Sequence, residues 1–151
     1  MDDLSGDRGA IFSPSRTFRY ALWRWWDRGK GYAMFVGLNP STAGETKDDP
    51  TLRRCKRFAA DWGYGGVVVT NLFALRARDP KVMLAHSNQT GPENDRWLRQ
   101  LSSEAGIVVA AWGNRGGHQG RDKAVLKLLG AVYHLGFTKA GKTETPTLSP
   151  G

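Results

Sequence analysis

Short apolar runs alternate with longer amphipathic segments along this chain. The apolar runs predict four buried strands, at residues 32–37, 67–71, 107–111 and 132–135. Helical spacing of apolar residues predicts helices at residues 50–62, 79–84, 92–103 and 123–129. Strands that alternate with helices indicate an α/β fold, and we expect a three-layer α/β/α sandwich with a parallel or mixed central sheet.

The two ends of the chain have a different character. Residues 18–26 are rich in aromatic side chains, and with the turn at residues 27–31 they predict an N-terminal hairpin over about residues 18–37. The aromatic residues are expected to pack in the core and on the sheet: Phe18, Tyr20, Trp23, Trp25 and Trp26. Residues 136–151 are rich in Thr, Lys, Gly and Pro and predict an irregular tail. With no repeat or linker, residues 1–151 are expected to form a single domain.

The start of the first long helix has strong local determinants. Asp49 is predicted to be its N-cap and Pro50 its first helical residue, while Gly63 ends it. The face opposite the apolar stripe is basic, with Arg53, Arg54, Lys56 and Arg57. Such a face is usually solvated, but it could also contact phosphates.

The charge balance narrows the choice of partners. The 151 residues include 22 Lys and Arg against 14 Asp and Glu, giving a net charge of +8 and a pI near 10.0. This predicts attraction to polyanions, DNA above all, although a basic surface without a partner is the alternative.

The composition argues against several other classes. A single cysteine forms neither a disulfide framework nor a thiolate zinc site, and the three histidines are far apart, so no metal and no cofactor are expected. The polar N-terminus lacks the pattern of a secretory signal, and no apolar run approaches membrane-spanning length. A cytoplasmic protein without an obligate protein partner is the expectation.

Three predicted strands end in turns that carry polar side chains or glycine, at residues 37–41, 70–73 and 112–116. Because the carboxyl ends of parallel strands meet at one edge of a sheet, we expect these turns to share a ligand-binding cleft. In the first turn, Gly37 allows close approach of a ligand and Pro40 fixes the backbone. Asn39 then presents a carboxamide that donates and accepts hydrogen bonds. An Asn-Pro pair alone would predict only a turn.

The side chains at these turns suit a flat heterocycle. Phe73 and Trp112 are predicted to stack on a base, and Asn39 or Asn71 to pair with its edge. The full predicted base-binding set is Gly37, Leu38, Pro40, Ser41, Asn71, Phe73 and Trp112. Aromatic residues at strand ends commonly plug the core instead, and this alternative stays open.

Two acidic residues follow the first turn. Asp48 and Asp49 lie in the loop that leaves it, and either carboxylate could stabilise an oxocarbenium ion or accept a proton from water. A helix cap and a solvated neighbour are the alternative roles. Asp49 is kept with Asn39 as a candidate catalytic residue.

Basic residues around the turns are candidates for phosphate contacts, which position a nucleic acid without reading its sequence. The predicted nucleic-acid-binding residues are Arg53, Arg54, Arg76, Arg115, Lys139 and Lys142. Residues 136–142 lack the spacing of a phosphate-binding loop, which argues against nucleoside triphosphate binding.

Several motifs together resemble those of the uncharacterised family DUF1643, over roughly residues 20–148. They are GLNPSTA (37–43), DDPTLRR (48–54), TNLFALR (70–76), GPEN (91–94) and AWG (111–113). The layout also resembles the uracil-DNA glycosylase superfamily, whose members carry a Gly-x-Asn/Asp-Pro turn after the first core strand. This second resemblance implies a uracil-DNA-glycosylase-like fold, in which Asn39 positions the hydrolytic water and residues 71–73 recognise the base.

The resemblance also implies two departures. Residues 145–150 are similar to the superfamily's His-Pro-Ser loop, but Thr145 stands in place of the histidine that stabilises the departing base. Where uracil-specific relatives have an aromatic residue that excludes a 5-methyl group, this chain has small residues at positions 41–44. A pyrimidine with a bulky 5-substituent, hydroxymethylated or glucosylated as in phage DNA, would then fit.

The expected function is that of a monofunctional DNA N-glycosylase, which flips a modified base out of double-stranded DNA and leaves an abasic site, with antiviral defence as the setting. Two alternatives stay open. One is an enzyme that modifies nucleotides or nucleobases in a DNA-hypermodification pathway, and the other is a binding module for modified nucleic acid without chemistry.

Overall fold

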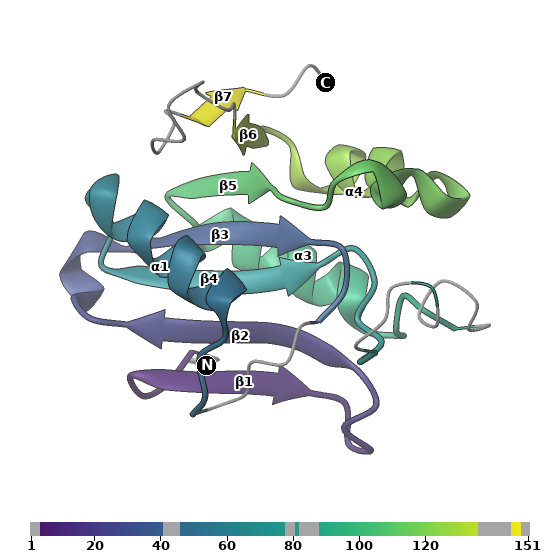
Figure 1. Cartoon of the computed structure of the whole chain (residues 1–151), viewed down its shortest axis with the longest axis horizontal. Helices are drawn as coiled ribbons and strands as arrows, with labels where there is room; N and C mark the ends of the chain where they lie inside the picture. Colours follow the sequence, from purple (N-terminus) through teal and green to yellow (C-terminus); the bar gives the residue numbers. More distant parts are fainter. Residues whose placement is uncertain (1–3, 41–45, 78–80, 82–87, 136–145, 149–151) are drawn as a thin grey trace.

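The computed structural model describes residues 4–40, 46–77, 81, 88–135 and 146–148. Within these residues, seven strands form one mixed sheet in the order β1-β2-β4-β3-β5-β6-β7 (Figure 1). The strands are β1 (Arg8–Phe12), β2 (Arg19–Trp25), β3 (Tyr32–Gly37), β4 (Gly66–Asn71), β5 (Ile107–Ala110), β6 (Tyr133–Leu135) and β7 (Pro146–Leu148). The four central strands β4, β3, β5 and β6 are parallel, while β1, β2 and β7 are antiparallel to their neighbours.

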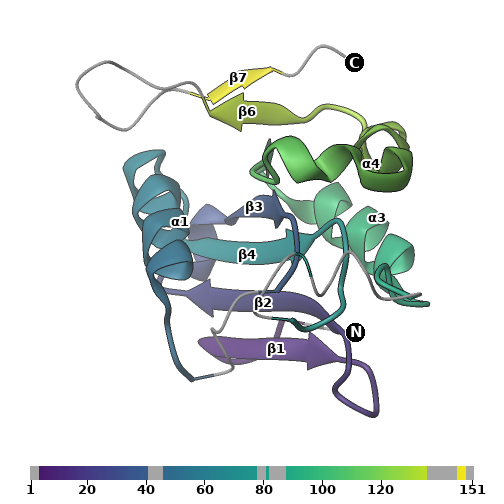
Figure 2. The same cartoon turned by 45° about the vertical axis from the view of Figure 1, so that its right-hand side comes forward.

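Helices cover both faces of this sheet, so the predicted α/β fold with three layers is confirmed (Figure 2). The described helices are α1 (Pro50–Asp61), α3 (Asn94–Glu104) and α4 (Arg121–Leu129), with short 3-10 helices η1 (Arg28–Lys30) and η2 (Asn114–Gly120). The helix α1 packs Leu52, Cys55 and Ala59 against one face. On the other face, α3 and α4 contribute Leu98 and Val125 to the larger core. None of the described helices has the length and apolarity needed to cross a membrane.

The predicted boundaries of these elements agree with the structure to within two residues at each end. The Asp49 carboxylate accepts a hydrogen bond from the Leu52 amide at 2.8 Å, and Pro50 occupies the first turn, so the predicted N-cap of α1 is confirmed. The chain after the helix turns at Gly63, whose φ is +89°. The helix predicted at residues 79–84 falls almost wholly outside the described residues.

The predicted N-terminal hairpin is wrong. The strands β2 and β3 do not pair with each other, because β4 lies between them and hydrogen-bonds to both. The crossover through α1 places β4 beside β3, as parallel strands require, and β2 pairs with the far edge of β4. Short-range spacing alone could not show this insertion. The tail prediction is wrong in part, since Pro146–Leu148 forms β7 at the sheet edge; residues 136–145 and 149–151 lie outside the described residues.

The aromatic residues near the N-terminus are mostly packed in the core, as predicted. Tyr20 and Trp23 are buried, and Phe18 and Trp25 pack against the same core from partly buried positions. Trp26 is the exception, because 44% of its surface is exposed. It directly follows β2, whose first six residues are all buried and whose last, Trp25, is partly buried.

The connections between the strands define the point of the sheet at which a ligand is expected to bind. From β3 the chain passes over one face through α1 to β4, and from β4 it passes over the other face through α3 to β5. The connections therefore diverge between β3 and β5, at the carboxyl ends of these strands. In open α/β sheets, ligands bind at this switch point.

Candidate functional site

The three polar turns predicted from the sequence do meet at one edge of the sheet. The turn after β4 is hydrogen-bonded to the turn after β3, through the Leu72 amide to the Gly37 carbonyl at 2.9 Å and the Phe73 amide to the Leu38 carbonyl at 3.0 Å. The turn after β5 is joined to β3, because the Ala111 amide donates to the Val36 carbonyl at 2.8 Å. We call this connected edge, residues 37–40, 71–77 and 111–113, the rim.

Asn39 is held by its side-chain amide within the rim. Its Nδ2 donates to the Ala77 carbonyl at 2.7 Å and more weakly to the Pro40 carbonyl at 3.4 Å. No described residue donates to its Oδ1. Asn39 is partly buried, and a carboxamide oxygen without a donor among the described residues has the capacity to accept a hydrogen bond from water or from a ligand.

The Asn71 side chain stabilises the first turn. Its side chain is only 3% exposed, and in the orientation that satisfies both neighbours its carboxamide nitrogen donates to the Asn39 carbonyl at 3.1 Å and the Thr70 carbonyl at 3.2 Å. Asn71 therefore fixes the backbone that carries Asn39. This is a supporting position, different from the base-pairing role that the sequence predicted for it.

Two residues from distant parts of the chain support the second turn. The buried Asn94 donates through Nδ2 to the carbonyls of Asn71 at 2.9 Å and Leu72 at 3.1 Å. Arg121 donates through Nε to the same Leu72 carbonyl at 2.8 Å and pairs with Asp95 at 2.6 Å. The rim is thus bonded to the first residues of α3 and α4, which restricts its movement.

The two aromatic residues predicted to stack on a base are placed differently from each other. Phe73 is completely buried in the core and contacts the His118 ring edge to face at 5.8 Å between centroids. Its ring has no exposed face, so Phe73 fills the core, which was the alternative role expected for aromatic residues at strand ends. Trp112 is partly exposed and folds over Gly116, where a Cβ would lie 2.1 Å from the indole Cδ1. Trp112 keeps part of its surface at the rim.

The Asp49 carboxylate is used by the fold. It is 7% exposed and caps α1, and it lies close enough to Arg19 to raise the pKa of that guanidinium. Burial acts more strongly in the opposite direction and lowers the pKa of Arg19 to about 10, so Arg19 stays charged at neutral pH. Asp49 is therefore a structural cap next to a buried cation, and its catalytic role stays a prediction.

The remaining predicted residues are placed as follows. Leu38 is partly buried and Pro40 is buried within the first turn. Four predicted phosphate-binding residues are exposed: Arg53, Arg54, Arg76 and Arg115. Arg76 is oriented over the Phe12 ring, 4.9 Å from its centroid. Ser41, Lys139 and Lys142 lie outside the described residues. Among the described residues, no three His, Cys, Asp or Glu side chains gather as metal ligands.

Sequence reasoning missed three buried polar residues: Asn94 and Arg121, which support the rim, and Arg19, which lies near Asp49. Two arginines, Arg19 and Arg24, stand in a strand whose other residues are aromatic or apolar, and this was an available indication for Arg19. Asn94 ends the GPEN motif, but nothing local indicates the role of Asn94 or Arg121, because each acts on a carbonyl more than 20 residues away.

Comparison with known proteins gives one match. The model of a family described as a protein of unknown function, DUF1643, matches residues 19–147. No curated protein and no solved structure matches the chain. The matched range includes β2, every helix described above and the whole rim.

Proposed function

The chain belongs to the DUF1643 family, and we propose that this protein is a DNA glycosylase that hydrolyses the N-glycosidic bond of a modified base. One observation carries the proposal. The Asn39 amide nitrogen donates to the Ala77 carbonyl at 2.7 Å, and among the described residues no donor is bound to its Oδ1, at the carboxyl end of β3. A neutral carboxamide with one fixed end and one available acceptor is suited to orient a water molecule.

The chemistry follows from what an amide is able to do. Asn39 cannot ionise as a strong base, so it acts by positioning and hydrogen bonding. Such help suffices for a dissociative reaction, in which the C1′–N bond breaks first and its electrons leave with the base. Water held at Asn39 Oδ1 then adds to the oxocarbenium carbon and releases a proton to solvent, leaving an abasic sugar.

The location of the site supports a base taken out of the helix. The rim lies at the switch point of the sheet, and a partly exposed Trp112 is available there to contact a flat ring. Small residues at positions 41–44 of the sequence favour a pyrimidine with a bulky 5-substituent. The exposed Arg53, Arg54 and Arg115 supply charge for the DNA backbone.

The decisive experiment measures bases released from phage DNA that contains hydroxymethylated or glucosylated cytosine, by mass spectrometry, with unmodified DNA in parallel. The native protein should release the modified base and leave alkali-labile sites. Asn39→Ala should reduce release by roughly 10²-fold or more while leaving DNA affinity unchanged. Unchanged turnover by Asn39→Ala would overturn the assignment. Arg99→Ala is the control, because Arg99 is exposed on α3 outside the rim, and this substitution should leave base release unchanged.

A second candidate function, recognition of modified nucleic acid without chemistry, is favoured by the position of Asp49. Its carboxylate caps α1 instead of standing open at the rim. Tight binding of modified DNA, with no base released by the native protein across the same substrates, would establish this second function in place of the first.

A further inference from the structure

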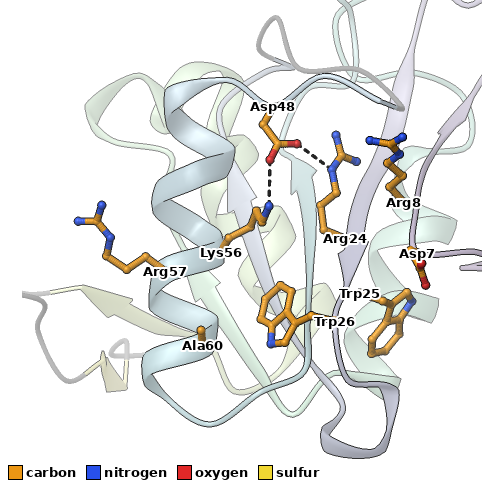
Figure 3. A pocket seen from close by; sticks show the side chains of 9 residues that line it. All are labelled: Asp7, Arg8, Arg24, Trp25, Trp26, Asp48, Lys56, Arg57 and Ala60. Carbon is orange, nitrogen blue, oxygen red and sulfur yellow. Dashed lines mark hydrogen bonds and ion pairs between the residues drawn. The ribbon is translucent and has the colours of Figure 1, made fainter.

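A groove separate from the rim lies between α1 and the outer strands of the sheet (Figure 3). Its volume is about 740 Å³. We call it the α1 groove, and its charged and aromatic lining includes Arg8, Arg24, Trp26, Asp48, Lys56 and Arg57. None of the rim residues lines it.

The groove exists because the sheet is wider than the helix above it. The helix α1 packs over β3 and β4, and the sheet continues past it to β2 and β1. Apart from Leu22 of β2, which joins the α1 core, no described helix covers this face of the two antiparallel strands (Figure 1). The side chains of Arg8 and Arg24 therefore form the floor and far wall, and α1 forms the near wall.

The positive charge in the α1 groove is fixed in position. The Asp48 carboxylate accepts from Arg24 Nε at 2.9 Å and from Lys56 Nζ at 3.0 Å, so one acid holds two bases in place. Arg24 also donates to the Trp23 carbonyl at 2.8 Å and to the Lys47 carbonyl at 3.4 Å, so its guanidinium is held within the protein and positions Asp48. Four basic residues line the groove against two acidic ones, and the excess charge is positive. Fixed cations lose little freedom when they bind an anion.

An exposed aromatic side chain completes the groove. Trp26 is the one large hydrophobic residue in the described part of the chain that is markedly exposed, at 44%. Its indole N–H donates to the Tyr64 carbonyl at 3.1 Å, which orients the ring. Figure 3 shows this indole beside Ala60, at the other end of the groove from the Asp48 network. An oriented indole near fixed cations is the combination found in grooves for single-stranded nucleic acid.

We propose that the α1 groove binds a segment of single-stranded DNA, with backbone phosphates at Arg8 and Lys56 and one base stacked on Trp26. Stacking requires a base whose face is accessible, which a single strand offers and an intact duplex does not. A chain net charge of +8 supplies the long-range attraction. The choice of DNA rests on the proposed function, whereas the geometry of the groove does not.

The test is fluorescence anisotropy with a labelled oligonucleotide of about 10 nucleotides, a length within the usual site size, in the Asn39→Ala background so that no base is released. Trp26→Ala should weaken binding by between roughly fivefold and 150-fold, and Trp26→Phe should recover most of the affinity. Arg8→Glu should weaken binding and lower the slope of log affinity against log salt by about 0.7 for each lost phosphate contact.

Arg99→Glu is the matched control, because Arg99 is exposed on α3 on the opposite face of the sheet and undergoes the same charge change. Equal weakening by Arg99→Glu and Arg8→Glu would mean that net charge alone acts, and it would overturn the proposal. So would native affinity in Trp26→Ala, or displacement of the oligonucleotide by polyglutamate at equal charge concentration. No release of any base by the native protein, with groove binding intact, would refute the glycosylase assignment alone.

Discussion

The carboxamide of Asn71 occupies the space that a side chain at Gly37 would need. A Cβ at position 37 would lie 2.9 Å from an oxygen or nitrogen of that carboxamide. Because residue 37 is a glycine, the Asn71 side chain of the second turn has room to contact the first turn. The same carboxamide holds the Asn39 carbonyl at 3.1 Å, so this packing contact and the position of Asn39 depend on each other.

Gly37→Ala should therefore destabilise the protein and disturb the rim. We expect the free energy of unfolding, measured in urea, to fall by about 1–3 kcal/mol because the buried carboxamide has little room to move. Gly117→Ala is the matched control, since a Cβ there meets nothing within 4 Å, and it should change stability by less than about 0.5 kcal/mol. Equal effects of the two substitutions would contradict the packing argument.

Asn94 and Arg121 should be energetically coupled through the Leu72 carbonyl, to which both donate. Removing one donor leaves the other, so each single Ala variant should lose about 1–3 kcal/mol of unfolding free energy. The double variant should lose at least about 0.5 kcal/mol more than the sum, because the buried carbonyl then has neither side-chain donor. Asn94→Ala combined with Arg99→Ala provides the control pair, which should be additive.

The main elements of the fold could be predicted because their causes are local. The apolar run of residues 32–37, the Asp49–Pro50 helix start and the helical spacing in α1 act within a few residues of themselves. The order of the strands could not be predicted this way. Whether β2 pairs with β3 or with β4 is decided by the α1 crossover, and the sequence of 18–37 is compatible with either arrangement.

The candidate site was predictable to the same degree. Three strand ends with polar turns indicated the rim, and parallel pairing brought them together. The individual roles were not predictable, because burial decides them. Phe73 and Asn71 are at the strand end, as expected, but they are 0% and 3% exposed and serve the core and the turn. The exposed Trp26 was expected in the core, since no sequence pattern marks where the continuous burial of β2 stops.

The Asp48 network should make stability depend on acid pH. Burial by itself would raise the pKa of Asp48, but the hydrogen bonds and charges of Lys56 and Arg24 outweigh it and lower this pKa below its usual value of 3.8. A carboxyl with a depressed folded pKa contributes stability above its unfolded pKa and loses that contribution as pH falls through the folded value. The contribution should therefore be complete at neutral pH and decline below about pH 3.8.

Asp48→Asn is the variant that measures this contribution. At pH 7 it should lower the free energy of unfolding by about 1–3 kcal/mol, because the largely buried Arg24 loses its charged acceptor. The difference from the native protein should shrink toward zero as the pH is lowered below 3.8. Asp7 lines the same groove but forms no ion pair with a described residue. Asp7→Asn should therefore show no comparable change. A difference that grows in acid would contradict this assignment.

Cys55, the one cysteine of the chain, should be unreactive in the folded protein. Burial raises the pKa of its thiol to about 12, with the nearby Asp49 acting in the same direction, and the side chain is 7% exposed inside the α1 core. The thiolate is the reacting species, and at pH 8 its population is roughly a thousandfold lower than for a thiol with the usual pKa of 9.0. An aromatic disulfide reagent should label about one thiol per chain in denaturant and react only through unfolding in buffer. Rapid labelling of the native protein would mean that α1 opens from the sheet, and Leu52→Ala, which loosens the same helix, should speed the labelling.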